Sequence, residues 1–278
     1  RRGVARDRPG VPRDPARRVR SLLIGVMCVL LASAGEPVGD GPVYVAVGDS
    51  LAVGMGASPS GDGGFVSVLA AQNPVCEDET CPALEVANFG SPGATSDTVA
   101  ATQLGPAVEL ISQRRRDGSN GNGVALVTVT VGGNDLFGSV FAACRRGPTD
   151  GCRAAASEAF TAYLQNLDAI LGELRAAAGP DTPIVTMTLY NPFPACLLTD
   201  LAPAAETVLE GGMAGLGGFN DIIRVVAGAH GVEVVETARL FSNADYVGGV
   251  DCIHPNASGH AKLAAAFAAV ADGTQSAG

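Results

Sequence analysis

The chain has 278 residues, 47% of them hydrophobic, which is enough for one sizeable core and does not require two domains. Its formal net charge is −10 at pH 7, and the first 34 residues carry eight of the 18 basic but two of the 28 acidic residues. The remaining residues therefore have a net charge of −16, which argues against binding to nucleic acid.

The first 34 residues have the pattern of a secretory leader. Residues 17–34 combine a basic flank, the apolar run 22–31 and a small-residue cleavage site, Ala32-Ser33-Ala34. The apolar run is well short of the ~20 residues that span a bilayer, so we expect no membrane anchor. Residues 1–16 are expected to be a disordered stub or an over-extended reading frame. We therefore predict an exported protein with a single mature domain over residues 35–278.

The first predicted strand covers residues 43–47, a short apolar run of β-branched and aromatic residues that is typical of a strand buried on both faces. Gly48 ends this strand, and Ser50 follows at the expected start of a helix. Open α/β sheets bind ligands beyond the carboxyl ends of their strands, which makes Ser50 a candidate nucleophile. A plain turn with Asp49 or Ser50 as a helix cap is the alternative that this tripeptide favours when it is taken alone.

Further strands and helices alternate along the rest of the chain. Strands are predicted over residues 84–89, 124–131, 183–189 and 232–235. Helices are predicted over residues 65–72, 96–116 with a break at Gly105-Pro106, 153–178, 204–230 with a glycine-rich interruption at 211–218, and 258–270. This alternation implies right-handed crossovers and a parallel sheet. The predicted fold class is α/β, a three-layer α/β/α sandwich with a parallel sheet of about five strands.

Residues suited to chemistry follow several of these strands. Gly90 follows the second strand and Asn134 the third, although alone these two residues fit a turn and a helix cap. Asp135 is expected to brace its loop. Residues 190–194 follow the fourth strand and are expected to form a pocket wall. A predicted loop over residues 251–254 carries an aspartate and a histidine.

Six cysteines remain after the leader is removed: Cys76, Cys81, Cys144, Cys152, Cys196 and Cys252. An even number of cysteines in an exported chain favours disulfides over free thiols or a zinc site. A zinc site is also disfavoured because the chain has no Cys-x-x-Cys spacing and only three histidines. Six cysteines allow fifteen pairings, and the sequence alone does not choose among them.

Four segments, in this order, resemble the motifs of the SGNH hydrolases, also called GDSL lipases and esterases: Gly48-Asp49-Ser50-Leu51, Asn88-Phe89-Gly90, Val131-Gly132-Gly133-Asn134-Asp135 and Asp251-Cys252-Ile253-His254-Pro255. The resemblance covers about residues 43–270. It implies the flavodoxin-like fold of that family, with its Ser, Gly, Asn and His at Ser50, Gly90, Asn134 and His254. Secreted members of the family can show sequential disulfides, which implies the pairs Cys76–Cys81, Cys144–Cys152 and Cys196–Cys252.

These residues permit ester hydrolysis through an acyl-enzyme. A serine hydroxyl needs a base to remove its proton, and the imidazole of His254 suits that task. Asp251 is in reach of the other imidazole nitrogen, although some members of the resembling family use a backbone carbonyl there. The backbone N–H groups of Ser50 and Gly90 and the amide of Asn134 would form the oxyanion hole.

The sequence contains no Gly-x-Ser-x-Gly elbow and no Ser-x-x-Lys, so the patterns of other serine hydrolases are missing. It also contains no nucleotide-binding glycine motif, and we expect no cofactor and no metal. We predict a secreted, monomeric serine carboxylester hydrolase that cleaves small-molecule or lipid esters. The lack of tryptophan favours an acyl pocket over a sugar-stacking platform. A carbohydrate acetyl esterase is the alternative enzyme, and an exported, non-catalytic binding protein on the same fold is the alternative from another class.

Overall fold

The computed structural model describes residues 41–58, 62–76, 81–117, 123–211, 215, 217–249 and 251–273. The chain divides into two units, Arg1–Gly39 and Asp40–Gly278. The predicted stub and signal peptide fall in the first unit and lie outside the described residues, and all elements below belong to the second unit. No helix in the described part of the chain is long and apolar enough to cross a membrane.

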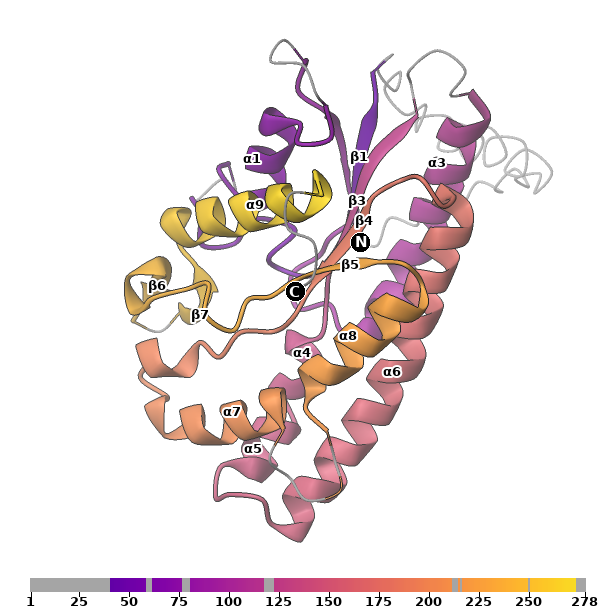
Figure 1. Cartoon of the computed structure of the whole chain (residues 1–278). Coiled ribbons are helices and arrows are strands. Elements are labelled where there is room, and N and C mark those ends of the chain that lie inside the picture. The colour runs from indigo at the N-terminus through magenta and orange to yellow at the C-terminus, as the bar shows by residue number, and fades with distance from the viewer. Residues whose placement is uncertain are drawn as a thin grey trace, which may run out of the picture. The chain divides into compact units, whose positions relative to one another are not determined.

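A five-stranded parallel sheet forms the centre of the second unit (Figure 1). Its strands are β1 (Val43–Gly48), β2 (Glu85–Asn88), β3 (Val124–Thr130), β4 (Ile184–Met187) and β5 (Glu233–Val235). They pair in parallel in the order β2-β1-β3-β4-β5. Every residue of β1 and β4 is buried, which agrees with continuous apolar strands that helices cover on both faces. The predicted parallel sheet is confirmed.

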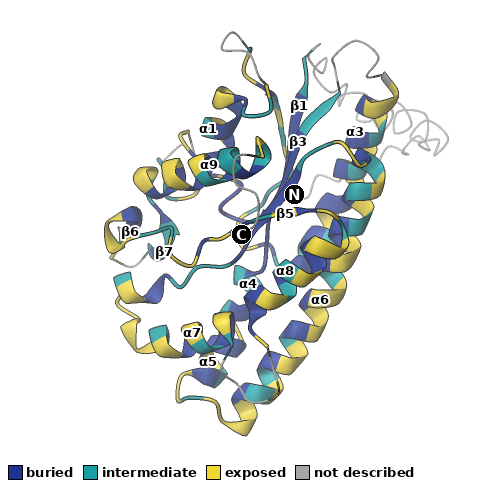
Figure 2. Cartoon of the chain, in the orientation of Figure 1, coloured by how far each residue is buried: buried dark blue, intermediate teal, exposed yellow. Residues whose placement is uncertain are grey.

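Helices cover both faces of this sheet, as the burial pattern in Figure 2 shows. One face packs against α3 (Leu104–Asp117), α6 (Asp150–Ala178) and α8 (Phe219–Ala229), and the other against α1 (Phe65–Gln72) and α9 (Ala257–Ala271). Val45 of β1 belongs to the first core and its neighbour Tyr44 to the second, because successive strand residues point to opposite faces. The three-layer α/β/α prediction is confirmed.

The predicted break at Gly105-Pro106 is wrong, because the helical run continues through it. The run contains α2 (Ser96–Thr98), the π-helical segment η2 (Val99–Gln103) and α3. The N–H of Leu104 donates to the carbonyl of Val99, five residues back. This wider turn lies just before Pro106, a residue that lacks an N–H and disfavours a regular helical turn before it. The irregularity expected at the proline therefore appears one turn earlier as a π segment.

The predicted loop over residues 251–254 is also wrong, because these residues lie in a strand. β7 (Asp251–Pro255) pairs antiparallel with β6 (Tyr246–Gly248). The partner strand β6 is three residues long and ends in Gly248, which has φ +83°. It is too short for an alternating apolar pattern, so the sequence does not predict the hairpin. The remaining short elements are α4 (Gly133–Phe137), α5 (Val140–Cys144), η4 (Phe193–Ala195), η5 (Thr199–Leu201), α7 (Ala202–Glu210) and η6 (Asn243–Asp245).

The structure joins the cysteines as Cys76–Cys81, Cys144–Cys152 and Cys196–Cys252, the pairs that the family resemblance implied. Two of the bonds close short loops. The third joins the segment after η4 to β7, and its cysteines are 56 positions apart in the sequence. The third bond therefore attaches the β6–β7 hairpin to the chain that follows β4.

Candidate active site

The turn that carries Ser50 is fixed by the end of β1. Gly48 has φ +152°, and a Cβ atom there would lie 2.3 Å from the carbonyl oxygen of Thr130, so a side chain does not fit. The amide of Gln103 accepts from the Gly48 N–H at 2.8 Å and donates to the Gly48 carbonyl at 2.9 Å. Gln103 is buried, and sequence reasoning missed it because no motif marks it. Both backbone polar groups of Gly48, the last residue of β1, are thus hydrogen-bonded to Gln103.

Ser50, His254 and Asp251 lie in hydrogen-bond contact with one another. The Oγ atom of Ser50 is 2.9 Å from Nε2 of His254, and Nδ1 of His254 is 2.7 Å from Oδ1 of Asp251. When Nδ1 carries the proton and donates it to Asp251, Nε2 is left to accept from the serine hydroxyl. The His254 side chain is 12% exposed, so the imidazole is largely shielded from water. The structure therefore brings together the three residues that sequence analysis singled out as nucleophile, base and orienting acid.

Three contacts hold the strand that carries His254. β7 pairs with β6, and Cys252 is bonded to Cys196. The hydroxyl of Tyr190 donates to the carbonyl oxygen of Ile253 at 2.8 Å. Tyr190 was expected in the pocket wall, and it does line the cavity, but its bond to β7 was not predicted. The position of the His254 imidazole thus depends on contacts from the chain that follows β4 as well as on the pairing of β7 with β6.

Asn134 lies inside α4 and not at its cap, because Gly132 precedes the helix. Its side chain lines the cavity beside Ser50 and donates one N–H to the Ala94 carbonyl at 2.9 Å. A side-chain amide has two N–H groups, so one remains for another acceptor. The helix-cap alternative for Asn134 therefore does not hold in this structure.

Gly90 is placed differently from Asn134. Its backbone N–H donates to Oδ1 of Asn88 at 2.9 Å, and the residue is not part of the cavity lining. Asn88 also donates to the carbonyl oxygen of Ala52 at 2.6 Å, which connects the end of β2 to the turn after Ser50. A Cβ atom on Gly90 would lie 2.7 Å from the Ala52 Cβ atom, so a side chain is disfavoured at this position.

Two carboxyl groups, the buried Asp49 and the half-buried Asp135, brace the loops around the nucleophile. Asp49 accepts from the N–H of Leu51 at 3.0 Å, so it braces the turn from which Ser50 reaches His254. Burial, with a smaller contribution from the nearby Asp135, raises the pKa of Asp49 to about 7. Asp135 accepts from the backbone N–H of Ser96 at 3.0 Å, which agrees with the bracing role expected for it. Burial raises its pKa as well.

An apolar cavity of about 70 Å³ opens beside Ser50 and His254. Phe137 and Phe141 contribute aromatic side chains to its lining, and Leu189, Pro192 and Leu209 contribute further apolar side chains. Of the predicted wall over residues 190–194, Tyr190 and Pro192 reach the lining, whereas Phe193 is buried and packs edge-on against Phe141 at 5.2 Å between ring centroids. The nucleophile therefore faces a small, largely apolar space.

The other two histidines have structural contacts. His260 is buried, accepts from the backbone N–H of Phe65 through Nδ1 and contacts the carbonyl oxygen of Met55 through Nε2. His230 ends α8 and lies 2.8 Å from Asp168. Within the residues that the structure describes, no group of three or more His, Cys, Asp or Glu side chains is arranged to hold a metal ion. The expectation of a metal-free and cofactor-free site stays a prediction.

Comparison with known proteins identifies the family. Residues 46–262 match the model of the GDSL-like Lipase/Acylhydrolase family, and no curated protein matches the chain. The lipase Lip_vut3 from a goat rumen metagenome has a similar structure, with a TM-score of 0.61 at 22% identity over 82% of this chain and 97% of that one.

Two further solved structures are similar. An extracellular lipase from Streptomyces rimosus has a TM-score of 0.53 at 20% identity, over 82% of this chain and 99% of that one. The acetylxylan esterase Axe2 from Geobacillus stearothermophilus has a TM-score of 0.53 at 17% identity, over 85% and 96%. These likenesses agree on the fold, and the family match covers most of the chain. The chain therefore belongs to the GDSL-like lipase/acylhydrolase family and is a serine ester hydrolase of that family.

Proposed function

We propose that the protein is a secreted, monomeric carboxylester hydrolase of the lipase or esterase kind, with Ser50 as nucleophile, His254 as base and Asp251 as the residue that orients His254. The observation that carries this proposal is the pair of hydrogen bonds of 2.9 and 2.7 Å that joins the three side chains beside an apolar cavity. A hydroxyl, an imidazole and a carboxylate in this order are the parts that nucleophilic acyl transfer requires.

In the first half-reaction, Nε2 of His254 takes the hydroxyl proton of Ser50 while Oγ attacks the ester carbonyl carbon. His254 then gives this proton to the leaving alcohol oxygen as the bond between carbon and that oxygen breaks, which leaves an acyl-serine. In the second half-reaction, His254 deprotonates a water that attacks the acyl carbonyl, and the proton returns to Ser50 as the acid leaves. Asp251 stabilises the imidazolium in both halves.

Negative charge develops on the carbonyl oxygen during each attack, and we assign its stabilisation to the backbone N–H of Ser50 and the second amide N–H of Asn134. No acceptor in the described residues pairs with the Ser50 N–H, and one amide N–H of Asn134 is left beside the cavity. Gly90 is proposed as a third donor. In this role the Gly90 N–H would break its hydrogen bond to Oδ1 of Asn88 and donate to the substrate oxygen instead.

Secretion is supported by the three disulfides and by the leader pattern of the sequence. Disulfides persist in oxidising compartments and are rare in the cytosol. The extracellular lipase from Streptomyces rimosus, which shares the fold, is a precedent for this location.

A panel of p-nitrophenyl esters of increasing acyl length tests the proposed function. We expect the wild-type protein to release p-nitrophenol from at least the short esters, and a fluorophosphonate probe to label Ser50 in the same preparation. Labelling is read by peptide mass spectrometry. If no ester is cleaved and Ser50 is not labelled, the fold is used for binding without turnover.

A carbohydrate acetyl esterase is the second candidate, and the small cavity favours it because an acetyl group is the smallest acyl group in this class of substrate. Acetylated xylan placed beside p-nitrophenyl acetate separates the two candidates. Release of acetate from the glycan at a kcat/KM above that for the artificial ester would assign the sugar substrate.

A further inference from the structure

The chain that follows β4 forms one wall of the cavity without a neighbouring strand. β4 and β5 pair as far as Met187 and Val235, and the Thr188 N–H still donates to the Val235 carbonyl at 3.0 Å. After this point the chain leaves the sheet. The backbone carbonyl of Thr188 is paired with a side chain, because the hydroxyl of Thr237 donates to it at 2.6 Å. The next residue, Leu189, lines the cavity and would have an unpaired backbone if nothing replaced the strand.

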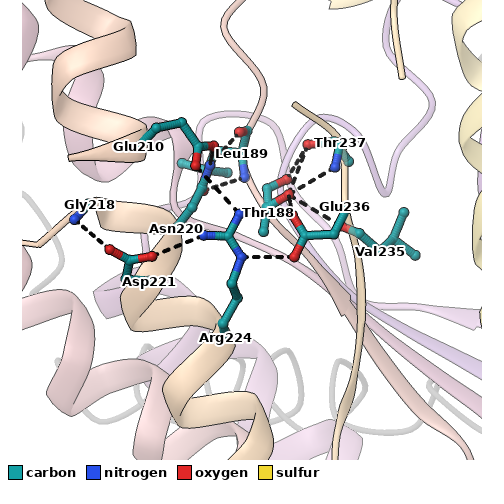
Figure 3. Close-up of polar contacts among 10 residues, drawn as sticks. All are labelled: Thr188, Leu189, Glu210, Gly218, Asn220, Asp221, Arg224, Val235, Glu236 and Thr237. Carbon is teal, nitrogen blue, oxygen red and sulfur yellow. Dashed lines mark hydrogen bonds and ion pairs between the residues drawn. The ribbon is translucent and has the colours of Figure 1, made fainter. Parts of the chain in front are cut away.

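Asn220 of α8 replaces the missing strand at Leu189, as Figure 3 shows. Its Oδ1 accepts from the Leu189 N–H at 2.7 Å, and its Nδ2 donates to the Leu189 carbonyl at 2.9 Å. Asn220 has no exposed surface, so these bonds are not exchanged for water. The backbone of Leu189 is therefore held as rigidly as a paired strand residue, by one side chain.

The same amide also holds a second wall of the cavity. Nδ2 of Asn220 donates to Oε1 of Glu210 at 2.6 Å. Glu210 is the last residue of α7 and directly follows Leu209, which lines the cavity. One buried side chain thus connects two segments that are 20 residues apart in the sequence and that each supply a leucine to the lining.

Arg224, one helical turn after Asn220, supports this arrangement from the outside (Figure 3). Its guanidinium contacts Glu236 at 2.8 Å, Asp221 at 3.0 Å and Glu210 at 3.5 Å. One oxygen of the Glu210 carboxylate therefore accepts a hydrogen bond from Asn220, and the other accepts one from Arg224. This charge pairing keeps Glu210 in place to accept from the buried amide.

A cavity of about 70 Å³ is small beside the roughly 300–1,000 Å³ of pockets that take drug-sized ligands. It has room for an acyl chain of a few carbon atoms. Moving the two leucines apart requires breaking the bonds of Asn220, a side chain that has no exposed surface. The cavity therefore cannot widen freely when a longer chain enters.

We propose that Asn220 is a positioning residue that sets acyl-chain length in this enzyme: it fixes Leu189 and Leu209 relative to each other, and the enzyme consequently acts on esters of short acyl chains. This inference rests on the proposed ester hydrolysis at Ser50. It extends that proposal to a substrate class and to a residue that does not touch the reacting atoms.

The test compares kcat/KM for p-nitrophenyl acetate, butyrate and octanoate. We expect the wild-type enzyme to prefer acetate or butyrate to octanoate. Asn220→Ala should raise the octanoate-to-butyrate ratio by about 10-fold, since a methylene in an apolar pocket changes selectivity by about that factor or more. The change should appear as a lower KM for octanoate, because Ser50 and His254 are untouched. Leu209→Ala, which enlarges the same wall directly, should shift the ratio in the same direction.

Two further variants separate positioning from simple destabilisation. Asn73→Ala removes another buried asparagine, which donates to the Pro82 carbonyl and lies outside the cavity. It should lower the melting temperature and leave the ratio unchanged. Glu210→Ala removes an exposed carboxylate and frees the α7 side only, so it tests the inference even if Asn220→Ala does not fold. Its ratio should rise by less than that of Asn220→Ala.

The activity of the wild-type protein tests the proposed ester hydrolysis, and the selectivity of the variants tests the role of Asn220. If wild-type protein hydrolyses none of the esters, the proposed function fails and this inference fails with it. If the esters are hydrolysed and the ratio stays at its wild-type value in every folded variant of Asn220 and Glu210, only the present inference is overturned, whatever the ratio of Leu209→Ala. A wild-type preference for octanoate would likewise contradict it.

Discussion

At the scale of single residues, Asn134 offers the cleanest test of the oxyanion hole. We expect Asn134→Ala to lower kcat by about 10² to 10³ with KM nearly unchanged, because its second amide N–H is proposed to bind the oxygen only as charge develops. Steady-state kinetics on p-nitrophenyl butyrate measures both constants. The variant also loses the bond to Ala94, so its melting temperature serves as the control. A change confined to KM would make Asn134 a substrate-binding or structural residue.

Asp49 makes the stability of the fold depend on pH. Because burial raises its pKa to about 7, the folded state binds a proton that the unfolded chain, with an ordinary pKa near 4, has released. Its contribution to stability is complete below pH 4 and is lost as the pH rises through 7.

Asp49→Asn should remove this contribution, which is on the order of 2 kcal/mol between pH 5 and pH 8. Urea unfolding at the two pH values, for wild type and variant, measures the difference. If both proteins change in parallel between pH 5 and pH 8, Asp49 does not titrate in this range.

At the scale of elements, the bond between Cys196 and Cys252 should affect catalysis as well as stability. It ties β7, which carries Asp251 and His254, to the chain after β4. In the chain-entropy model, a disulfide that closes a loop of this length raises the free energy of unfolding by about 4 kcal/mol. Displacing a catalytic group by about 1 Å can cost 10²-fold in rate. We therefore expect Cys196→Ala/Cys252→Ala to lose kcat and melting temperature together.

Cys144→Ala/Cys152→Ala is the matched control for this prediction. Its disulfide joins α5 to the start of α6 and does not touch β7. It should lower the melting temperature and leave kcat close to the wild-type value. Equal kcat losses in the two double variants would show that the 196–252 bond has no special effect on the catalytic strand.

At the scale of the whole molecule, the parallel direction of the strands followed from the alternation of apolar runs and helices, whereas their order in the sheet was not predicted from it. The position of Ser50 beyond β1 followed from the same pattern. Local patterns carry this information because a buried strand must be apolar and a parallel connection must cross over. The family match bears out the resemblance read from four short motifs.

The features that sequence reasoning missed depend on contacts between distant segments. Gln103 holds Gly48 and Asn220 holds Leu189, across 55 and 31 positions respectively, and neither amide lies in a motif. The sequence predicts a loop at residues 251–254 because β6, the partner strand of β7, is too short to leave a pattern. The bond from Gly90 to Asn88 depends on a side-chain orientation that no pattern specifies.

Whether Ser50 performs the ester hydrolysis is decided by the activity of the Ser50→Ala variant. Removing a hydroxyl at the end of a strand leaves the packing of β1 in place, so the circular dichroism spectrum and melting temperature should match those of the wild type. Hydrolysis of p-nitrophenyl butyrate should fall to the rate of the buffer. A folded Ser50→Ala protein that still turns over the ester at a rate near the wild type would exclude Ser50 as the nucleophile.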